Sequence, residues 1–314
     1  MQLDVIVPTY NRHSLLKRAL QSLLAAELPA NLDVKITIVD NNSRDETSSV
    51  VDSFKPSFNG RLNYLFEPKP GKSHALNTGI AATSGELVGM IDDDEEIDRS
   101  WFVRINEVFT NKELDFIGGP YVPRWGAPPP SWLPSRYSGV IGAFCLGSER
   151  RPYGADTPLP GGNAVVRRST LEKLMPYATD LGPHGDDYLA DEDTDMYLRL
   201  MASGAKGLYL PDLVVYHYIH PQRLTKHYYR HWCFRRGVSS GILDRKHRKK
   251  VPYFLGVPRY LFGQAARASW QILKTVGKDN EKPSQKFSHE LSFWDLAGFF
   301  YGKHFYRATE DLKS

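Results

Sequence analysis

The chain of 314 residues has only two cysteines, Cys145 and Cys233, which are far apart in the sequence. Two isolated cysteines cannot form a disulfide framework, and without a CxxC pair the usual signature of a structural zinc or dithiol redox site is missing. The N-terminus also lacks the basic and apolar regions of a signal peptide. We therefore expect a cytoplasmic protein.

Long hydrophobic runs are missing as well. No stretch of about 18 residues is free of charged and polar side chains, so we predict no membrane-spanning helix, and any membrane contact would be peripheral. Two phosphate-binding motifs are absent too: GxxxxGK[ST], and a GxGxxG after the first strand. ATPases and dinucleotide-dependent dehydrogenases therefore lose their main support.

What is present fits a folded α/β protein of one or two domains. Hydrophobic residues make up 41% and charged residues 24%, both close to globular averages. The net charge of +4 is unevenly distributed, because residues 221–314 hold 19 Lys/Arg and 7 Asp/Glu, a balance of +12, whereas residues 1–220 carry −8. We predict a catalytic domain over 1–220 and a basic, aromatic, helical region over 221–314.

Strand-like and helix-like patterns alternate over the first hundred residues. The predicted strands are Leu3–Pro8, Val34–Val39, Leu62–Phe66 and Leu87–Ile91. The predicted helices are the segment after Asn11 that carries Leu15 to Leu24, then Asp45–Phe54 and Ser73–Thr83. This βα series predicts a mostly parallel sheet with helices on both faces and ligands at the carboxyl ends of the strands.

Further along the chain the pattern is less regular. The proline-rich segment Pro120–Pro160 is expected to be mostly irregular, as a candidate lid or acceptor loop, and its Trp125 and Trp132 either stack on sugars or pack in a core. After it we predict strands at Ala164–Val166, Leu208–Leu210 and Val214–Tyr218, and a helix over Asp191–Ala202.

Three consecutive aspartates, Asp92 to Asp94, directly follow a buried strand. Adjacent carboxylates repel one another unless a cation neutralises them, so we predict a Mg²⁺ or Mn²⁺ site shared with substrate phosphates. A nucleoside diphosphate is the ligand that this arrangement implies. The alternative is a solvated acidic turn.

Several motifs occur together in one order, and in that order they resemble the nucleotide-sugar domain of the family 2 glycosyltransferases. The resemblance covers roughly residues 3–220 and rests on Val5–Arg12, Ile38–Ser43 with Asp45, Gly71–Gly79, Asp92–Asp94, Gly161–Asn163, Asp191–Asp193 and His217. It implies a GT-A fold, a nucleotide-activated sugar with UDP-sugars favoured, a divalent metal and inversion at the anomeric carbon.

The resemblance also assigns roles to residues by their position in these motifs. It places Pro8, Thr9 and Tyr10 in a nucleoside pocket, Asp40 on the base, Lys72 near the diphosphate, Asp92 on the ribose or nucleotide, Asp94 and His217 on the metal, and Gly161 and Gly162 where donor and acceptor sugars approach closely. Three of these residues have structural alternatives, as a helix cap for Asp40, an exposed lysine for Lys72 and a core histidine for His217. Asn77 is expected to fix loop geometry.

The acidic cluster around residue 193 opens a predicted helix, where the helix dipole favours carboxylates with or without catalysis. The resemblance makes Asp193 the general base and leaves Glu192 as the alternative base. Asp195 lies four residues before Arg199, so we interpret those two as a structural pair.

The predicted function is an inverting transfer of a sugar to a hydroxyl of a glycan or lipid-linked acceptor, in polysaccharide biosynthesis of the cell envelope. Two alternatives remain, a sugar nucleotidyltransferase and a non-catalytic nucleotide-sugar-binding protein. No nucleic-acid-binding motif accompanies the basic C-terminal region.

The C-terminal region combines basic charge with aromatic patches. The basic residues Arg245, Lys246, Arg248, Lys249 and Lys250 precede the patches Tyr253–Phe262 and Phe293–Phe305. Such a combination suits an anionic bilayer, which predicts peripheral attachment to the inner face of the cell membrane. The alternative is that these helices pack onto the catalytic domain.

Overall fold

The computed structural model describes residues 1–154, 157, 159–184, 187–188, 191–248, 250–275 and 283–306. The chain forms two compact units. The first comprises Met1–Arg124, Ala143–Gly185 and Glu192–Tyr218, and the second Trp125–Gly142, Asp186–Asp191 and Ile219–Ser314. The predicted division into domains after residue 220 stays a prediction. The second unit differs from the predicted C-terminal region in that it also includes Trp125–Gly142, a segment of the proline-rich stretch.

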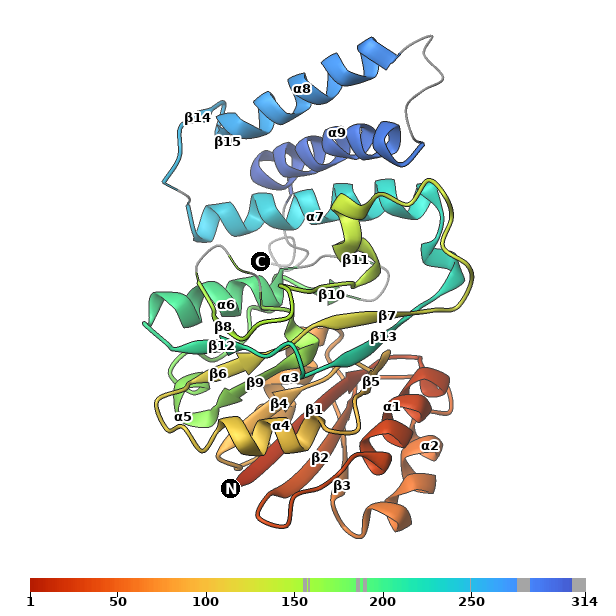
Figure 1. The fold of residues 1–314 in the computed structure, drawn as a ribbon, viewed down its shortest axis with the longest axis vertical. Helices are drawn as coiled ribbons and strands as arrows, with labels where there is room; N and C mark the ends of the chain where they lie inside the picture. The colour runs from red at the N-terminus through yellow and green to blue at the C-terminus, as the bar shows by residue number, and fades with distance from the viewer. Residues whose placement is uncertain are drawn as a thin grey trace. The chain divides into compact units, whose positions relative to one another are not determined.

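An eight-stranded sheet forms the centre of the first unit (Figure 1). Its strands, in spatial order, are β3 (Leu62–Phe66), β2 (Asp33–Asp40), β1 (Gln2–Thr9), β4 (Leu87–Met90), β9 (Ala164–Arg167), β6 (Phe116–Gly118), β12 (Gly207–Tyr209) and β8 (Arg151–Pro152). The first four are parallel to one another, and so are β6 and β12. Strands β9 and β8 run antiparallel to their neighbours. The predicted mostly parallel sheet is thus confirmed.

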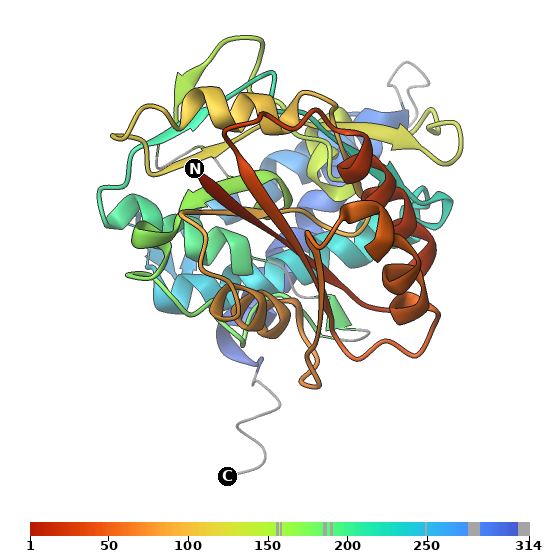
Figure 2. The ribbon, with the colours of Figure 1, turned by 90° about the horizontal axis from the view of Figure 1, so that it is seen from below.

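Helices cover both faces of this sheet. The helices of the first unit are α1 (His13–Ala25), α2 (Thr47–Phe54), α3 (Lys72–Ala81), α4 (Trp101–Val108), α5 (Arg168–Leu171) and α6 (Glu192–Ala202), with 3₁₀ turns η1 (Lys55–Phe58) and η3 (Gly161–Asn163). Figure 2 shows α4 and α3 on opposite sides of the sheet.

Alternation along β1 explains the two layers, because successive side chains of a strand point to opposite faces. Val5 and Val7 join one core cluster with α1, α2 and α4, whereas Ile6 joins the other with α3, α5 and α6. Every side chain from Leu3 to Thr9 is buried. The apolar run in the sequence therefore belongs to a strand covered on both faces.

A smaller sheet, in the order β5-β13-β7, follows the acidic end of β4. Its strands are β5 (Glu95–Ile97), β13 (Val215–Ile219) and β7 (Tyr121–Trp125). Antiparallel pairing of β5 with β13 sets His217 opposite Glu95. This pairing connects the chain near residue 217 to the aspartate triplet.

The prediction that Pro120–Pro160 is mostly irregular is confirmed, since fewer than half of its described residues belong to a strand or helical turn. Within its described residues, this segment contributes β7, β8 and a 3₁₀ turn, η2 (Ser135–Ile141). Proline is tolerated at strand ends and edges, so its abundance did not prevent short strands from forming. The role of this segment as a lid or acceptor loop stays a prediction.

The second unit is helical, as predicted for the C-terminal region. It contains α7 (Lys226–Lys246), α8 (Arg259–Thr275) and α9 (Pro283–His304), the turn η4 (Pro221–Arg223) and the short hairpin of β14 (Tyr253–Phe254) and β15 (Val257–Pro258). Two further two-residue strands, β10 (Pro183–His184) and β11 (Asp187–Tyr188), lie before α6 in the sequence.

Helices α7 and α9 pack backbone against backbone. A Cβ atom at Gly237 would lie 2.4 Å from the carbonyl oxygen of Asp295, and one at Gly302 would lie 2.1 Å from that of Val238. Only glycine permits this approach. Ion pairs between Arg236 and Asp295 and between Lys303 and Asp244 join the same helices. Within the described part of the chain, none of the helices has both the length and the apolar character that crossing a bilayer requires.

Candidate active site

The carboxyl ends of β1, β2 and β4 meet at one edge of the sheet. Thr9, the last residue of β1, pairs with Asp40, the last residue of β2, and Ile6 pairs with Met90 at the end of β4. Asp92 follows two residues later. The predicted nucleotide-contacting residues of three strands therefore share the edge where open α/β sheets bind ligands.

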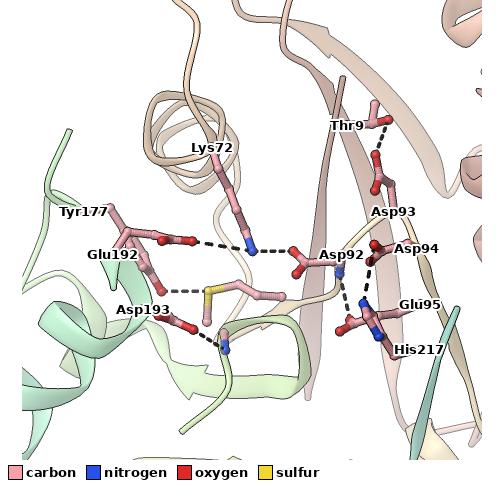
Figure 3. A network of polar contacts seen from close by, with 12 residues as sticks. Thr9, Lys72, Asp92, Asp93, Asp94, Glu95, Tyr177, Glu192, Asp193 and His217 are labelled. Carbon is pink, nitrogen blue, oxygen red and sulfur yellow. Dashed lines mark hydrogen bonds and ion pairs between the residues drawn. The ribbon is translucent and has the colours of Figure 1, made fainter. Parts of the chain in front are cut away.

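Lys72, the first residue of α3, connects the aspartate triplet to α6. Its Nζ lies 2.5 Å from Oδ1 of Asp92 and 3.7 Å from Oε1 of Glu192 (Figure 3). Burial lowers the pKa of Lys72, but the two carboxylates outweigh burial and hold that pKa well above its usual value. The alternative that Lys72 is an exposed lysine is wrong, since only 21% of its side chain is exposed.

Asp93 points away from Asp92, toward β1. Its carboxylate accepts a hydrogen bond from the hydroxyl of Thr9 at 2.8 Å and another from Arg12 at 3.0 Å. Burial raises the pKa of Asp93 to about 6, although Arg12 opposes this shift. Asp93 therefore fixes the triplet to the end of β1.

Glu95 supports the triplet from beneath. Its Oε2 accepts the backbone N–H of Asp92 at 2.9 Å, while Oε1 is buried without a hydrogen-bond partner among the described residues. Burial, with the charges of Asp92 and Asp94, raises the pKa of Glu95 well above its usual value. A Cβ at Gly162 would lie 2.6 Å from both Glu95 carboxylate oxygens, so a side chain at this position would displace that carboxylate.

The turn that contains Gly161 and Gly162 is held by Asn163. Its Oδ1 accepts a hydrogen bond from the indole of Trp101 at 2.9 Å, and its Nδ2 donates to the carbonyl of Leu213 at 2.7 Å. Asn163 is completely buried. The two glycines are thus presented by a rigid turn, which favours a defined approach for a ligand.

Asp94 and His217 bring a carboxylate oxygen and an imidazole nitrogen close together. Oδ2 of Asp94 lies 3.4 Å from Nε2 of His217, and both residues are more than nine-tenths buried. Carboxylate oxygen and imidazole nitrogen suit Mn²⁺, and adjacent ligands on an octahedral ion with bonds of about 2.1 Å lie roughly 3 Å apart. The pair therefore fits such an ion.

Two further observations bear on this pair. Arg12 also reaches Oδ2 of Asp94, at 3.3 Å. Among the described residues, no group of three or more His, Cys, Asp or Glu could hold a metal. An ion held by Asp94 and His217 alone would need substrate phosphates and water to complete its coordination.

The first turn of α6 places two carboxylates in different environments. Oδ2 of Asp193 accepts the backbone N–H of Gly161 at 3.2 Å, and Oδ1 accepts that of Thr194 at 2.7 Å. Glu192 is buried, and burial together with the Asp193 charge raises the pKa of Glu192 to about 8, against the opposing effect of Lys72. Asp193 is the more accessible of the two.

Two structural interpretations from the sequence are confirmed. Arg199 forms an ion pair with Asp195 at 2.7 Å. Asn77 accepts the backbone N–H of Tyr177 at 2.8 Å and donates to its carbonyl at 3.1 Å, so it fixes the loop before α6.

Asp40 lies outside this group of contacts. Its Oδ1 accepts the backbone N–H of Ser43 at 2.8 Å and its Oδ2 accepts the hydroxyl of Tyr64 at 2.7 Å. The first N–H of α2 is instead accepted by Asp45 at 3.1 Å, so the helix-cap alternative for Asp40 is wrong. Its contact with a base stays a prediction.

The three residues predicted to line the nucleoside pocket lie at the end of β1. Pro8 and Thr9 are buried, and Tyr10 is 44% exposed. Their role stays a prediction as well.

The two tryptophans of the proline-rich stretch differ. Trp132 packs edge-on against Tyr229 and Phe287 within the second unit, with ring centroids 5.4 and 5.2 Å away, so it belongs to a core. Trp125 is 37% exposed.

The sequence pattern indicates no role for Arg12 or Glu95, although Arg12 ends the motif Val5–Arg12 and Glu95 directly follows the aspartate triplet. Arg12 lies just after the end of β1, and the aspartate triplet lies just after the end of β4. A cation that follows one strand and an acidic run that follows another were the signal that could have indicated their contact. Glu95 extends the acidic run by one residue, but its burial follows from the β5–β13 pairing, which no local pattern reveals.

Comparison with known proteins identifies relatives of this chain. Residues 4–175, more than half of the chain, match the family described as Glycosyl transferase family 2. The succinoglycan biosynthesis protein ExoM of Rhizobium meliloti (strain 1021) is 24% identical over 245 residues, 77% of this chain and 75% of that protein. The glucosyl-dolichyl phosphate glucuronosyltransferase of Haloferax volcanii is 22% identical over 252 residues, 78% of each chain.

A solved structure shares the fold. The mannosyltransferase PcManGT from Pyrobaculum calidifontis, in complex with GDP-Man and Mn²⁺, matches with a TM-score of 0.64 and 19% identity, over 96% of this chain and 86% of that chain. This likeness confirms the predicted GT-A type α/β fold.

Proposed function

Because this chain belongs to glycosyl transferase family 2, we propose that it inverts the anomeric carbon while moving a sugar from a nucleoside-diphosphate donor to a hydroxyl of a glycan or lipid-linked acceptor. Sugar transfer from a nucleotide-sugar donor follows from the family itself. The finer assignments of metal, base and acceptor are supported by the geometry around Lys72.

One observation carries the proposal. Lys72 contacts Asp92 at the end of β4 and lies 3.7 Å from Glu192 at the start of α6, directly beside Asp193. Asp92, which is expected to contact the nucleotide, therefore pairs with this ammonium group, and the charge of Asp193, the expected acceptor of the proton, also acts on it. An electrostatic centre of this kind, poorly accessible to water, suits a reaction that separates charge.

In the proposed reaction, the acceptor oxygen bonds to the anomeric carbon as the bond from that carbon to the diphosphate oxygen breaks. The electron pair leaves with the diphosphate, and the acceptor proton passes to Asp193. Its two hydrogen bonds from Gly161 and Thr194 orient the carboxylate, while each oxygen keeps a lone pair for the hydroxyl. General-base catalysis of this kind typically contributes about 10² to 10⁴ in rate.

Three residues act on the leaving group. Lys72 would exchange part of its interaction with Asp92 for the diphosphate. Asp94 and His217 would hold Mn²⁺ or Mg²⁺, and the ion would supply positive charge where negative charge develops on the diphosphate. The relative of similar fold was solved with GDP-Man and Mn²⁺, which supports this part of the proposal.

The acceptor is proposed from two features. Gly161 and Gly162 let their turn pack closely on Asp193 and Glu95, because a Cβ at either glycine would collide with those side chains, so the backbone of the turn lies directly beside the proposed base. The similar ExoM and glucuronosyltransferase carry names that place them in polysaccharide and dolichyl-phosphate chemistry. We therefore propose an acceptor from cell-envelope polysaccharide biosynthesis, handled on the cytoplasmic side.

The experiment is a panel of nucleotide sugars, with UDP-sugars tested first, added to the purified protein with Mn²⁺. We expect one donor to raise the melting temperature and to be hydrolysed slowly, and the product formed with an acceptor to have the opposite anomeric configuration by NMR. Turnover of a nucleoside triphosphate with a sugar phosphate would instead indicate a nucleotidyltransferase. Absence of both protection and hydrolysis across the panel would contradict the proposal.

A further inference from the structure

Large apolar side chains are exposed at one end of the helical unit. Phe254 is 58% exposed, Leu255 63% and Phe305 62%, with Phe300 and Tyr301 exposed by 36% and 45%. We refer to these five residues as the aromatic tip. Monomeric proteins rarely expose so many large apolar groups together without a binding role.

Contacts show that these residues form one surface. The tip begins at the turn between β14 and β15, where Leu255 and Gly256 have positive φ angles. Nε2 of His304 lies 2.9 Å from the carbonyl oxygen of Leu255, which joins this turn to the end of α9. Figure 1 shows β14 and β15 where α7 ends and α8 begins.

Ring contacts extend the surface along α9. The ring of Phe305 lies 5.9 Å from that of Phe300 and 6.3 Å from that of Tyr301. Phe254 contacts Phe262 of α8 at 5.7 Å. Buried Phe299 faces the other way, so the surface is narrower than the aromatic patch read from the sequence.

Two arginines lie beside the tip. Arg245 donates to the carbonyl of Gly302 at 2.7 Å, and the guanidinium of Arg248 lies 4.5 Å from the ring centre of Tyr253, the neighbour of Phe254. Both arginines are exposed, as are Lys246 and Lys250.

Among the described residues, Asp244 is an acidic neighbour of these cations but does not cancel their charge. Asp244 is buried and forms an ion pair with Lys303 at 2.7 Å. Lys249, the remaining cation of the predicted basic stretch, lies outside the described residues.

We propose that the aromatic tip inserts into the headgroup region of an anionic lipid bilayer, with Arg245, Lys246, Arg248 and Lys250 on the lipid phosphates. Aromatic rings favour the interface between water and hydrocarbon, and basic residues beside them add attraction to anionic lipids. A protein partner would need an apolar groove ringed by acidic groups, whereas a bilayer supplies both features everywhere on its surface. The site lies wholly within the helical unit and is independent of the sugar chemistry.

The test is co-sedimentation of the full-length protein with vesicles of phosphatidylcholine containing increasing phosphatidylglycerol. We expect binding to rise with phosphatidylglycerol and to fall with salt. The variant Lys246→Gln/Arg248→Gln/Lys250→Gln should bind less, by roughly fivefold for each charge removed. A matched control, Lys17→Gln/Lys35→Gln/Lys112→Gln, removes three exposed lysines from the first unit and should bind nearly as the wild type.

A second pair of variants tests the apolar part. Phe254→Ser/Leu255→Ser/Phe305→Ser should lower binding on the order of tenfold or more, because three apolar groups no longer leave water. The control Leu24→Ser/Leu28→Ser/Phe66→Ser changes exposed residues of the first unit and should not lower it. If the triple tip variant fails to fold by circular dichroism, the single variants Phe254→Ser and Phe305→Ser replace it.

Several results would overturn the proposal. The first is that the wild type binds no vesicle at low salt. The second is that the tip variants and the control variants lose vesicle binding equally. The third is that the wild type dimerises through the tip while the tip variant binds vesicles as well as the wild type does. Donor hydrolysis, measured in parallel, should be unchanged in the tip variants. A failure of membrane binding is thereby distinguished from a failure of the proposed sugar transfer.

Discussion

The ammonium group of Lys72 lies 2.5 Å from the carboxylate of Asp92, and both side chains are more than two thirds buried. This ion pair joins the start of α3 to the end of β4. The second carboxylate near Lys72, that of Glu192, extends the connection to α6. The stability and the chemistry of the site therefore depend on the same cation.

Replacing Lys72 should destabilise the protein. Lys72→Met leaves two mostly buried acidic side chains without their cation, and breaking a buried pair in this way typically costs about 3–5 kcal/mol in the free energy of unfolding. Urea unfolding measures it. The control Lys55→Met breaks an exposed pair with Asp52 and should cost less than about 1 kcal/mol. Glu192→Gln should recover part of the loss in the Lys72→Met background, and equal costs for the two lysine variants would refute the assignment.

Glu192 should make stability depend on pH. Its pKa of about 8 in the folded protein lies above the ordinary value of about 4.5, so the folded state binds an extra proton between these values. The free energy of unfolding contributed by Glu192 is then largest below the lower value, falls as pH rises through this window, and is constant above about 8.

Glu192→Gln removes this dependence. Urea unfolding gives the free energy of unfolding of the variant minus that of the wild type at each pH. We expect this difference to be larger at about pH 8.5 than at about pH 5. Glu113→Gln, which changes an exposed glutamate, serves as the control. A difference between Glu192→Gln and wild type that is the same at both pH values would contradict the pKa assignment.

Donor binding should require a divalent cation. Asp94→Asn and His217→Gln each remove a proposed ligand, so calorimetry should show that Mn²⁺ no longer strengthens the binding of the nucleoside diphosphate as it does in the wild type. Asp52→Asn, a change of an exposed carboxylate, should keep the metal effect. Equally tight binding by the wild type in EDTA and in Mn²⁺ would show that no metal bridge is used.

Local patterns in the sequence predict the fold of the first ninety residues well. The strands β1 to β4 and the helices between them follow from buried apolar runs and turn residues, and the acidic triplet follows β4 as expected. Long-range pairing is different. Strand β9 inserts antiparallel between β4 and β6, and no residue in Ala164–Arg167 specifies that neighbour or direction.

The same distinction applies to the site. Positions of Asp92, Asp94 and Asp193 at element ends were predictable from spacing, because a strand end or helix start is a local feature. Which carboxylate Lys72 meets, and that Glu192 is buried while Asp193 is partly exposed, depends on how α3 and α6 pack. That packing is a property of the whole core.

The most direct test is the transfer rate of Asp193→Asn with the donor identified by the panel. The substitution keeps the size of the side chain and removes the proton acceptor. We expect transfer to fall by about 10² to 10⁴ while donor affinity and melting temperature stay near wild type, with a smaller loss of transfer in Glu192→Gln. Near-wild-type transfer by Asp193→Asn, with the loss found in Glu192→Gln instead, would contradict Asp193 as the base.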